Sequence, residues 1–203
     1  MIFEEVVEPP SRATAWLNYA ALLLTVTAAA GILTAALYFQ YTAGEIPCPL
    51  CLLQRVALFG VCFGAMLSFR HGFSYANSGI SLIFSVFLLV VSARQSLQDI
   101  YPRPGHAYIG SAVLGLHMPV WSVLIGLALL IGQAIQLALF GNSRRVLDTD
   151  LRAFPVLTAL ATLVSLYVIA LCAANLVSVI LQCGIDQCHT FGYQLLSPAS
   201  NPS

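Results

Sequence analysis

The sequence has very little charge and no lysine. Charged residues make up 8% of its 203 residues, against about 25% in an ordinary soluble domain, while 59% are hydrophobic. A water-soluble fold of this size needs far more polar surface, so this composition excludes a soluble globular domain. The sequence also lacks a nucleotide-binding glycine loop and a basic patch, and we expect no nucleic-acid partner.

The apolar residues gather into five segments, near 15–38, 52–69, 74–93, 120–140 and 154–181. A helix needs roughly 20 such residues to cross a hydrocarbon core of about 30 Å. The sequence therefore predicts an all-α membrane protein with five transmembrane helices. The fifth segment extends for about 42 Å as a helix, so it must tilt or project beyond the bilayer.

All eight basic residues are arginines, and their distribution predicts the orientation. With the N-terminus inside, five arginines fall on the inner side and three on the outer side, which is a modest positive-inside bias. We expect residues 1–14 and 141–153 to be cytoplasmic and residues 182–203 to form an outer tail. The acidic opening of the chain does not fit a cleaved signal peptide. The inner set is Arg12, Arg70, Arg144, Arg145 and Arg152, and the outer set is Arg55, Arg94 and Arg103.

This topology places two cysteine pairs in the outer compartment, where disulfides persist. The first pair, Cys48 and Cys51, follows the first span, and the second pair, Cys183 and Cys188, follows the fifth. Cys62 and Cys172 fall within spans and are predicted to act as small hydrophobic residues.

The first pair stands where the second span begins. With Cys48 as the N-cap and Pro49 as the first helical residue, Cys51 lies in the first turn. The partial positive charge of a helix N-terminus favours a thiolate there, and an i, i+3 pair can close a disulfide. Arg55 follows Cys51 by four residues and shares its face, so it can stabilise a thiolate or hold a polar ligand oxygen. The alternative is an arginine that snorkels to the headgroups.

The two cysteines of the second pair are five positions apart, about 140° around a continuous helix, which is a poor arrangement for a disulfide. Gly184 and Asp186 favour a turn that can bring Cys183 and Cys188 together. The spacing fits an exchangeable loop disulfide and a purely structural one equally well.

Three motifs resemble the DsbB family of bacterial inner-membrane proteins, which reoxidise a periplasmic thiol oxidase and pass the electrons to quinone. They are CPLCLLQRVALFG at 48–60, LQDIYPRP at 97–104 and LGLHMPVW at 114–121. The resemblance extends over roughly residues 16–140. It implies a four-helix transmembrane bundle of DsbB type at 15–140, and the fifth transmembrane helix expected at 154–181 is additional to that bundle.

The resemblance also implies roles for individual residues. Cys51 would face the quinone (ubiquinone or menaquinone), and Cys48 would exchange with the second pair. Arg55 would position and polarise the quinone, while Arg94 and Gln95 stand where the family often has a histidine near it. The implied protein partner is a periplasmic DsbA-like thiol oxidase.

The sequence departs from the family in one important respect. The family usually carries its second redox pair between spans three and four, but residues 98–119 contain no cysteine. We therefore expect Cys183 and Cys188 to substitute for that pair.

Two other interpretations fit the same cysteines. The four outer thiolates, with His189 in reserve, can form a zinc site of a non-enzymatic membrane protein. Oxidoreductase chemistry with a reversed electron flow or a different partner, as in vitamin K epoxide reductase-like enzymes, fits the cysteine arrangement but not the motifs.

Overall fold

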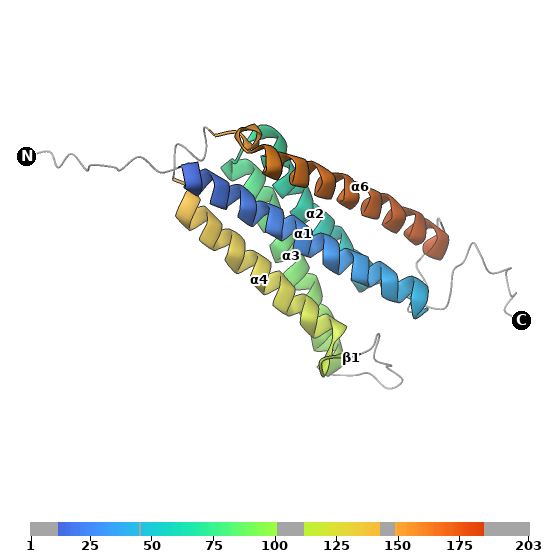
Figure 1. Ribbon diagram of the computed structural model, residues 1–203. Helices are drawn as coiled ribbons and strands as arrows, with labels where there is room; N and C mark the ends of the chain where they lie inside the picture. Colours follow the sequence, from blue (N-terminus) through green and yellow to red (C-terminus); the bar gives the residue numbers. More distant parts are fainter. Residues whose placement is uncertain (1–11, 45, 101–111, 143–148, 185–203) are drawn as a thin grey trace, which may run out of the picture.

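The computed structural model describes residues 12–44, 46–100, 112–142 and 149–184. Within these ranges, five helices are long and apolar enough to cross a membrane, so the expected all-α class and five spans are confirmed. Figure 1 shows them as one bundle. Their bounds are α1 (Arg12–Thr42), α2 (Pro49–His71), α3 (Tyr75–Ile100), α4 (Met118–Phe140) and α6 (Pro155–Cys183).

Two short elements precede the later helices. A two-stranded antiparallel hairpin, β1 (Ala112–Val113) and β2 (Leu116–His117), leads directly into α4. Its two turn residues, Leu114 and Gly115, both have positive φ, at 52° and 80°, as a type I′ hairpin turn requires. A single 3₁₀ turn, η1 (Leu151–Ala153), precedes α6.

The helices run alternately up and down the bundle. The C-terminal ends of α1, α3 and α6 therefore lie together with the N-terminal ends of α2 and α4, and we call this the disulfide end. At the opposite end, the Tyr19 hydroxyl of α1 donates a hydrogen bond of 2.7 Å to the carbonyl of Thr149, before α6. Tyr75 of α3 likewise donates to the carbonyl of Gly141, which follows α4.

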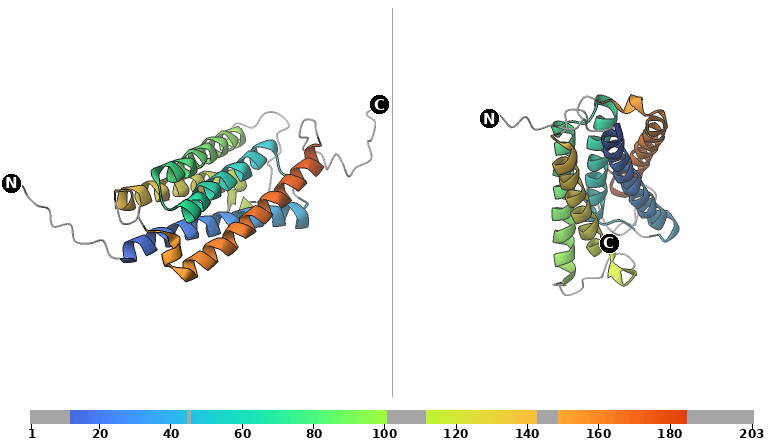
Figure 2. Two further views of the ribbon diagram at one scale, coloured as in Figure 1. Left: turned by 90° about the horizontal axis from the view of Figure 1, so that it is seen from above. Right: turned by 60° about the vertical axis from the view of Figure 1, so that its left-hand side comes forward.

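The helix α2 lies at the centre of the bundle. It packs against α3, which in turn packs against α4, while α1 and α6 pack against each other and against α2. Figure 2 shows α3 and α4 on one side of α2 and α6 on the other. Toward the disulfide end, α1 and α4 diverge.

Glycines allow α2 and α3 to approach closely. A Cβ on Gly64 would lie 2.7 Å from the backbone oxygen of Asn77 and 2.7 Å from the backbone nitrogen of Ser81. A Cβ on Gly60 would overlap the ring of Phe84. Close backbone approach at small residues is how membrane helices associate, because lipid supplies no hydrophobic driving force between them.

We predict that Gly64→Ala destabilises the protein by about 1–3 kcal/mol, because the added methyl group meets backbone atoms that cannot move aside. Thermal unfolding in detergent measures this effect. The matched control is Gly132→Ala on α4, where nothing lies within 4 Å of the added Cβ. Equal melting temperatures for the two variants would contradict the close contact.

Candidate functional site

The first cysteine pair forms a disulfide at the N-terminus of α2. Cys48 is the N-cap and Pro49 occupies the first turn, as the sequence predicts. The Cys48 and Cys51 Cα atoms are 5.0 Å apart, and the Cys51 amide donates to Cys48 Sγ at 3.1 Å. Both sulfurs therefore lie at the positive end of the α2 dipole, which favours a thiolate when the bond is reduced.

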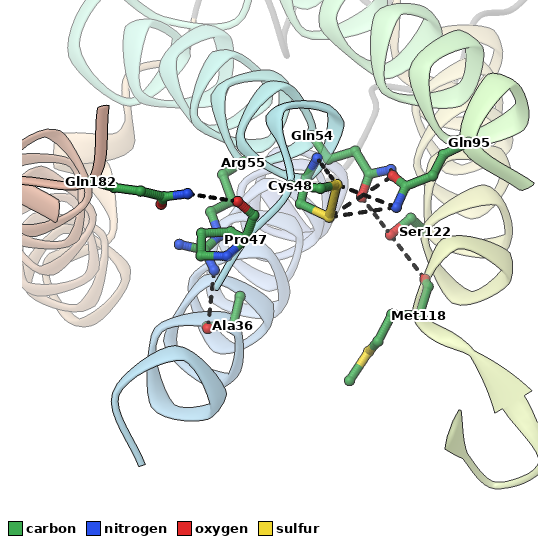
Figure 3. Close-up of a disulfide and its surroundings, with 10 residues drawn as sticks. Ala36, Pro47, Cys48, Gln54, Arg55, Gln95, Met118, Ser122 and Gln182 are labelled. Carbon is green, nitrogen blue, oxygen red and sulfur yellow. Dashed lines mark hydrogen bonds between the residues drawn. A yellow bond between two sulfur atoms is a disulfide. The ribbon is translucent and has the colours of Figure 1, made fainter. Parts of the chain in front are cut away.

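A buried amide from α3 faces both sulfurs (Figure 3). Gln95 is 5% exposed, and its Nε2 lies 3.5 Å from Cys48 Sγ and 3.5 Å from Cys51 Sγ. The Gln95 NH₂ group is an N–H donor, and such a donor interacts more strongly with a thiolate than with a neutral sulfur. The contact thus favours the charged form of a reduced cysteine.

Two further side chains fix the direction of that amide. Gln54 of α2 donates from Nε2 to Gln95 Oε1 at 2.8 Å, so the Gln95 NH₂ group is turned toward the sulfurs. Ser122 of α4 donates in turn to Gln54 Oε1 at 3.0 Å. A chain of hydrogen bonds therefore connects α4, α2 and α3 to the disulfide, and it orients each amide in sequence (Figure 3).

Arg55 is buried, with 7% of its surface exposed. Its guanidinium donates to Gln40 Oε1 at 2.6 Å, to Asn175 Oδ1 at 3.3 Å and to the Ala36 carbonyl at 3.1 Å. A charged group within the bundle is costly unless protein groups replace its hydration. Acceptors from α1 and α6 do so here, and they hold the side chain within the bundle instead of at the headgroups.

A cavity of about 730 Å³ lies beside the disulfide. Cys51 and Arg55 both line it, whereas Cys48 does not, so the two cysteines differ in what they face. The size suits a small organic ligand, and an apolar wall with a few fixed polar groups is typical of such sites. The polar lining is Gln40, Cys51, Gln54, Arg55 and Ser122, and the apolar lining includes Ile32, Ala35, Ala36, Phe39, Leu58, Leu88, Met118, Trp121 and Ile125.

The end of α6 meets the segment that carries Cys48. Gln182 is fully buried, and its Nε2 donates to the Pro47 carbonyl at 2.9 Å (Figure 3). Cys183, the next residue, is 4% exposed and is not one of the free cysteines. The structure therefore brings Cys183 to the end of the bundle that holds the first pair, while Cys188 and His189 lie outside the described residues.

The residues expected from the sequence divide into three groups. Cys48, Cys51, Arg55 and Gln95 come together, although Gln95 faces the sulfurs and is not part of the cavity lining. Arg94 is exposed and does not line the cavity. Cys62 and Cys172 are free cysteines, the first buried and the second exposed.

Sequence reasoning did not assign roles to Gln40, Gln54, Ser122 or Asn175. Three of these are amides inside apolar helices, where polar side chains are rare and usually face the protein interior. The rarity of amides in apolar helices is the sequence signal that could have marked these three residues as candidates. In the described part of the chain, no group of three or more His, Cys, Asp or Glu side chains is arranged to hold a metal ion.

Comparison with known proteins gives a consistent result. Residues 18–106 match the family model described as disulfide bond formation protein DsbB. The Disulfide bond formation protein B of Nitrosomonas eutropha is 35% identical over 85 residues, which cover 40% of this chain and 52% of the relative. Its namesake in Paracidovorax citrulli is 37% identical over 93 residues, covering 43% and 53%.

The chain thus spans about half the length of the curated relatives it matches. The matched region contains α2, most of α1 and all of α3, and it ends before α4 and α6. No solved structure matches the chain.

We predict that Gln95→Leu slows alkylation of reduced Cys51 about tenfold at fixed pH. Leucine has a similar size but no N–H group, so the thiolate loses a hydrogen bond worth about 1.5 kcal/mol or more. Mass spectrometry of the alkylated peptide measures the rate. The control is Gln98→Leu, on the exposed face of the same helix, which should leave the rate unchanged. Equal rates in the two variants would show that the amide does not stabilise the thiolate.

Proposed function

We propose that this chain, whose residues 18–106 match the DsbB family model, is a DsbB-type membrane protein-dithiol oxidase whose electrons pass to a quinone. The observation that carries this proposal is the position of the Cys48–Cys51 disulfide. One of its two residues, Cys51, lines a large, mostly apolar cavity that Arg55 also lines. An acceptor that enters this apolar cavity can reach Cys51 and reoxidise the dithiol.

A quinone (ubiquinone or menaquinone) fits the chemistry of the cavity. Its ring is apolar and its two carbonyl oxygens accept hydrogen bonds. The apolar lining suits the ring, while the Arg55 guanidinium supplies N–H groups for an oxygen. When bound, the quinone accepts two electrons and two protons and becomes a quinol.

The proposed relay has three exchanges, and each conserves electrons. First, the two thiols of a periplasmic DsbA-like oxidase are oxidised to a disulfide as the Cys183–Cys188 disulfide is reduced. The thiols of Cys183 and Cys188 then reduce Cys48–Cys51 through a mixed disulfide at Cys48. Finally, the Cys48 and Cys51 thiols close to a disulfide again and release two electrons and two protons to the acceptor.

The positions of the two first-pair residues support this order. Cys51 lines the cavity, whereas Cys48 follows Pro47, the residue that Gln182 contacts. Cys48 is also only 5% exposed, which limits direct attack by a bulky protein partner. The Cys183 and Cys188 thiols, which follow α6 in the same chain, provide a smaller nucleophile than a separate protein.

The five membrane-spanning helices fit a multi-pass membrane protein. We place it in the bacterial inner membrane, with the N-terminus in the cytoplasm and the disulfide end in the periplasm. This orientation is the one favoured by the arginine distribution, and it puts both cysteine pairs in an oxidising compartment.

The relay predicts distinct effects for cysteine variants. Anaerobic mixing of the purified protein with a quinone and a reduced thioredoxin-like oxidase, followed by quinone absorbance, measures turnover. Cys51→Ser should abolish quinone reduction, and Cys183→Ser combined with Cys188→Ser should abolish oxidation of the protein partner. The matched control is Cys172→Ser, because Cys172 is a free cysteine on the exposed face of α6.

Two outcomes would count against the proposal. Full turnover in the Cys183, Cys188 double variant removes the second pair from the relay. Absence of quinone reduction by the unaltered protein, together with stoichiometric zinc on its thiols, favours the metal-binding interpretation instead.

Arg55→Met should raise the KM for quinone by about 10–100-fold, because it removes a charged donor to a carbonyl oxygen, worth about 1.5–3 kcal/mol. Steady-state kinetics across quinone concentrations measures the change. Arg70→Met is the control, since Arg70 is exposed at the opposite end of the bundle. An unchanged KM for Arg55→Met would remove the guanidinium from the acceptor site.

A further inference from the structure

The helix α6 lies outside the region that matches the family, yet its buried face is polar at the disulfide end. Asn175, Ser178 and Gln182 are 6%, 1% and 0% exposed. Their spacing of three and four residues places them along one stripe of the helix. In a span surrounded by lipid, a stripe of buried polar side chains needs partners within the protein.

Those partners are all residues of the cavity wall. Asn175 Oδ1 accepts from Arg55 at 3.3 Å, and Ser178 Oγ accepts from Gln40 Nε2 at 2.6 Å. Arg55 and Gln40 line the cavity, whereas Asn175 and Ser178 do not. At these positions α6 therefore lies outside the cavity lining, and it contacts Arg55 and Gln40, which face the cavity.

The Ser178 contact also sets the direction of the Gln40 amide. Because Gln40 gives its N–H to Ser178, its carbonyl oxygen is turned toward Arg55, which donates to it at 2.6 Å. Arg55 thus donates to Asn175, an acceptor on α6, and to Gln40, an acceptor that Ser178 of α6 orients. Two converging acceptors restrict a long, flexible side chain to one position, and such preorganisation lowers the entropy cost of binding a ligand.

We propose that Asn175 and Ser178 are positioning residues of the acceptor cavity, so that the affinity for quinone depends on α6. This inference rests on the proposed function, and it gives α6 a role beyond carrying Cys183. Neither residue reaches the cavity, so both act through Arg55 and Gln40.

The test measures quinone binding directly. The chain has two tryptophans, and Trp121 lines the cavity, whereas Trp16 lies near the start of α1 at the opposite end. In a Trp16→Phe background, quenching of Trp121 fluorescence by a short-chain ubiquinone reports binding without turnover. The KM for the same quinone and the kcat at saturating quinone are measured in parallel.

Asn175→Leu should raise both the Kd and the KM for the quinone about tenfold, with kcat at saturation within about twofold of the unaltered protein. Asn175→Asp keeps an acceptor oxygen in the same place and should bind more tightly than Asn175→Leu. Ser178→Ala, a milder change that removes the Gln40 acceptor, should raise the Kd about threefold.

The matched control is Asn18→Leu. Asn18 is also a fully buried asparagine, but it accepts from Gln136 at 2.8 Å and does not line the cavity. This variant should lower the melting temperature and leave the quinone Kd unchanged.

Two results would overturn the inference in distinguishable ways. If Asn175→Leu and Ser178→Ala melt at lower temperature but bind quinone like the unaltered protein, the two residues only dock α6. If the unaltered protein itself shows no quenching and no quinone reduction, the proposed function fails together with the inference.

Discussion

A guanidinium between membrane helices must be hydrogen-bonded by the protein, because lipid tails cannot solvate it. The rest of the disulfide end is arranged around this constraint at Arg55. Its acceptors come from α1 and α6, while the side chain itself belongs to α2. Satisfying one charge therefore brings three helices together, and it does so beside the turn that carries the disulfide.

The groups that meet this requirement are mostly amides. Gln40 links Arg55 to Ser178, and Gln54 links Ser122 to Gln95. An amide has both a donor and an acceptor, so it can continue a hydrogen-bond chain from one helix to the next. It does this without a second buried charge, whose desolvation would cost several kcal/mol. Neutral side chains thus position a cation on one side of Cys51 and an N–H donor on the other.

Local features of the site were predictable from the sequence because they depend on neighbours in the chain. The N-cap at Cys48, the helical position of Pro49 and the shared face of Cys51 and Arg55 all follow from helix geometry. The five spans follow from hydropathy in the same way. None of these features requires knowledge of how one helix is rotated against another.

The contacts between helices do require that knowledge. Arg94 and Gln95 are adjacent, so they point about 100° apart, and only the rotation of α3 decides which one faces the disulfide. The structure buries Gln95 and exposes Arg94, although the sequence analysis placed both of them near the quinone. Asn175 is a similar case, since it lies 120 residues from Arg55 and no local pattern relates the two.

The number of spans is consistent with the proposal that a cysteine pair after the fifth helix replaces one in an earlier loop. Thiol–disulfide exchange requires two sulfurs to approach in space, and the order of residues along the chain does not enter. Each membrane crossing moves the chain to the other end of the bundle, so cysteines placed directly after α4 would lie beside Gly141, at the end opposite to Cys48. One more crossing returns the chain to the disulfide end. The contact between Gln182 and Pro47 then holds the last turn of α6 against the segment before Cys48. A single additional helix is thus the smallest extension that brings a pair following α4 to the disulfide end, and the same helix supplies the acceptor that Arg55 needs.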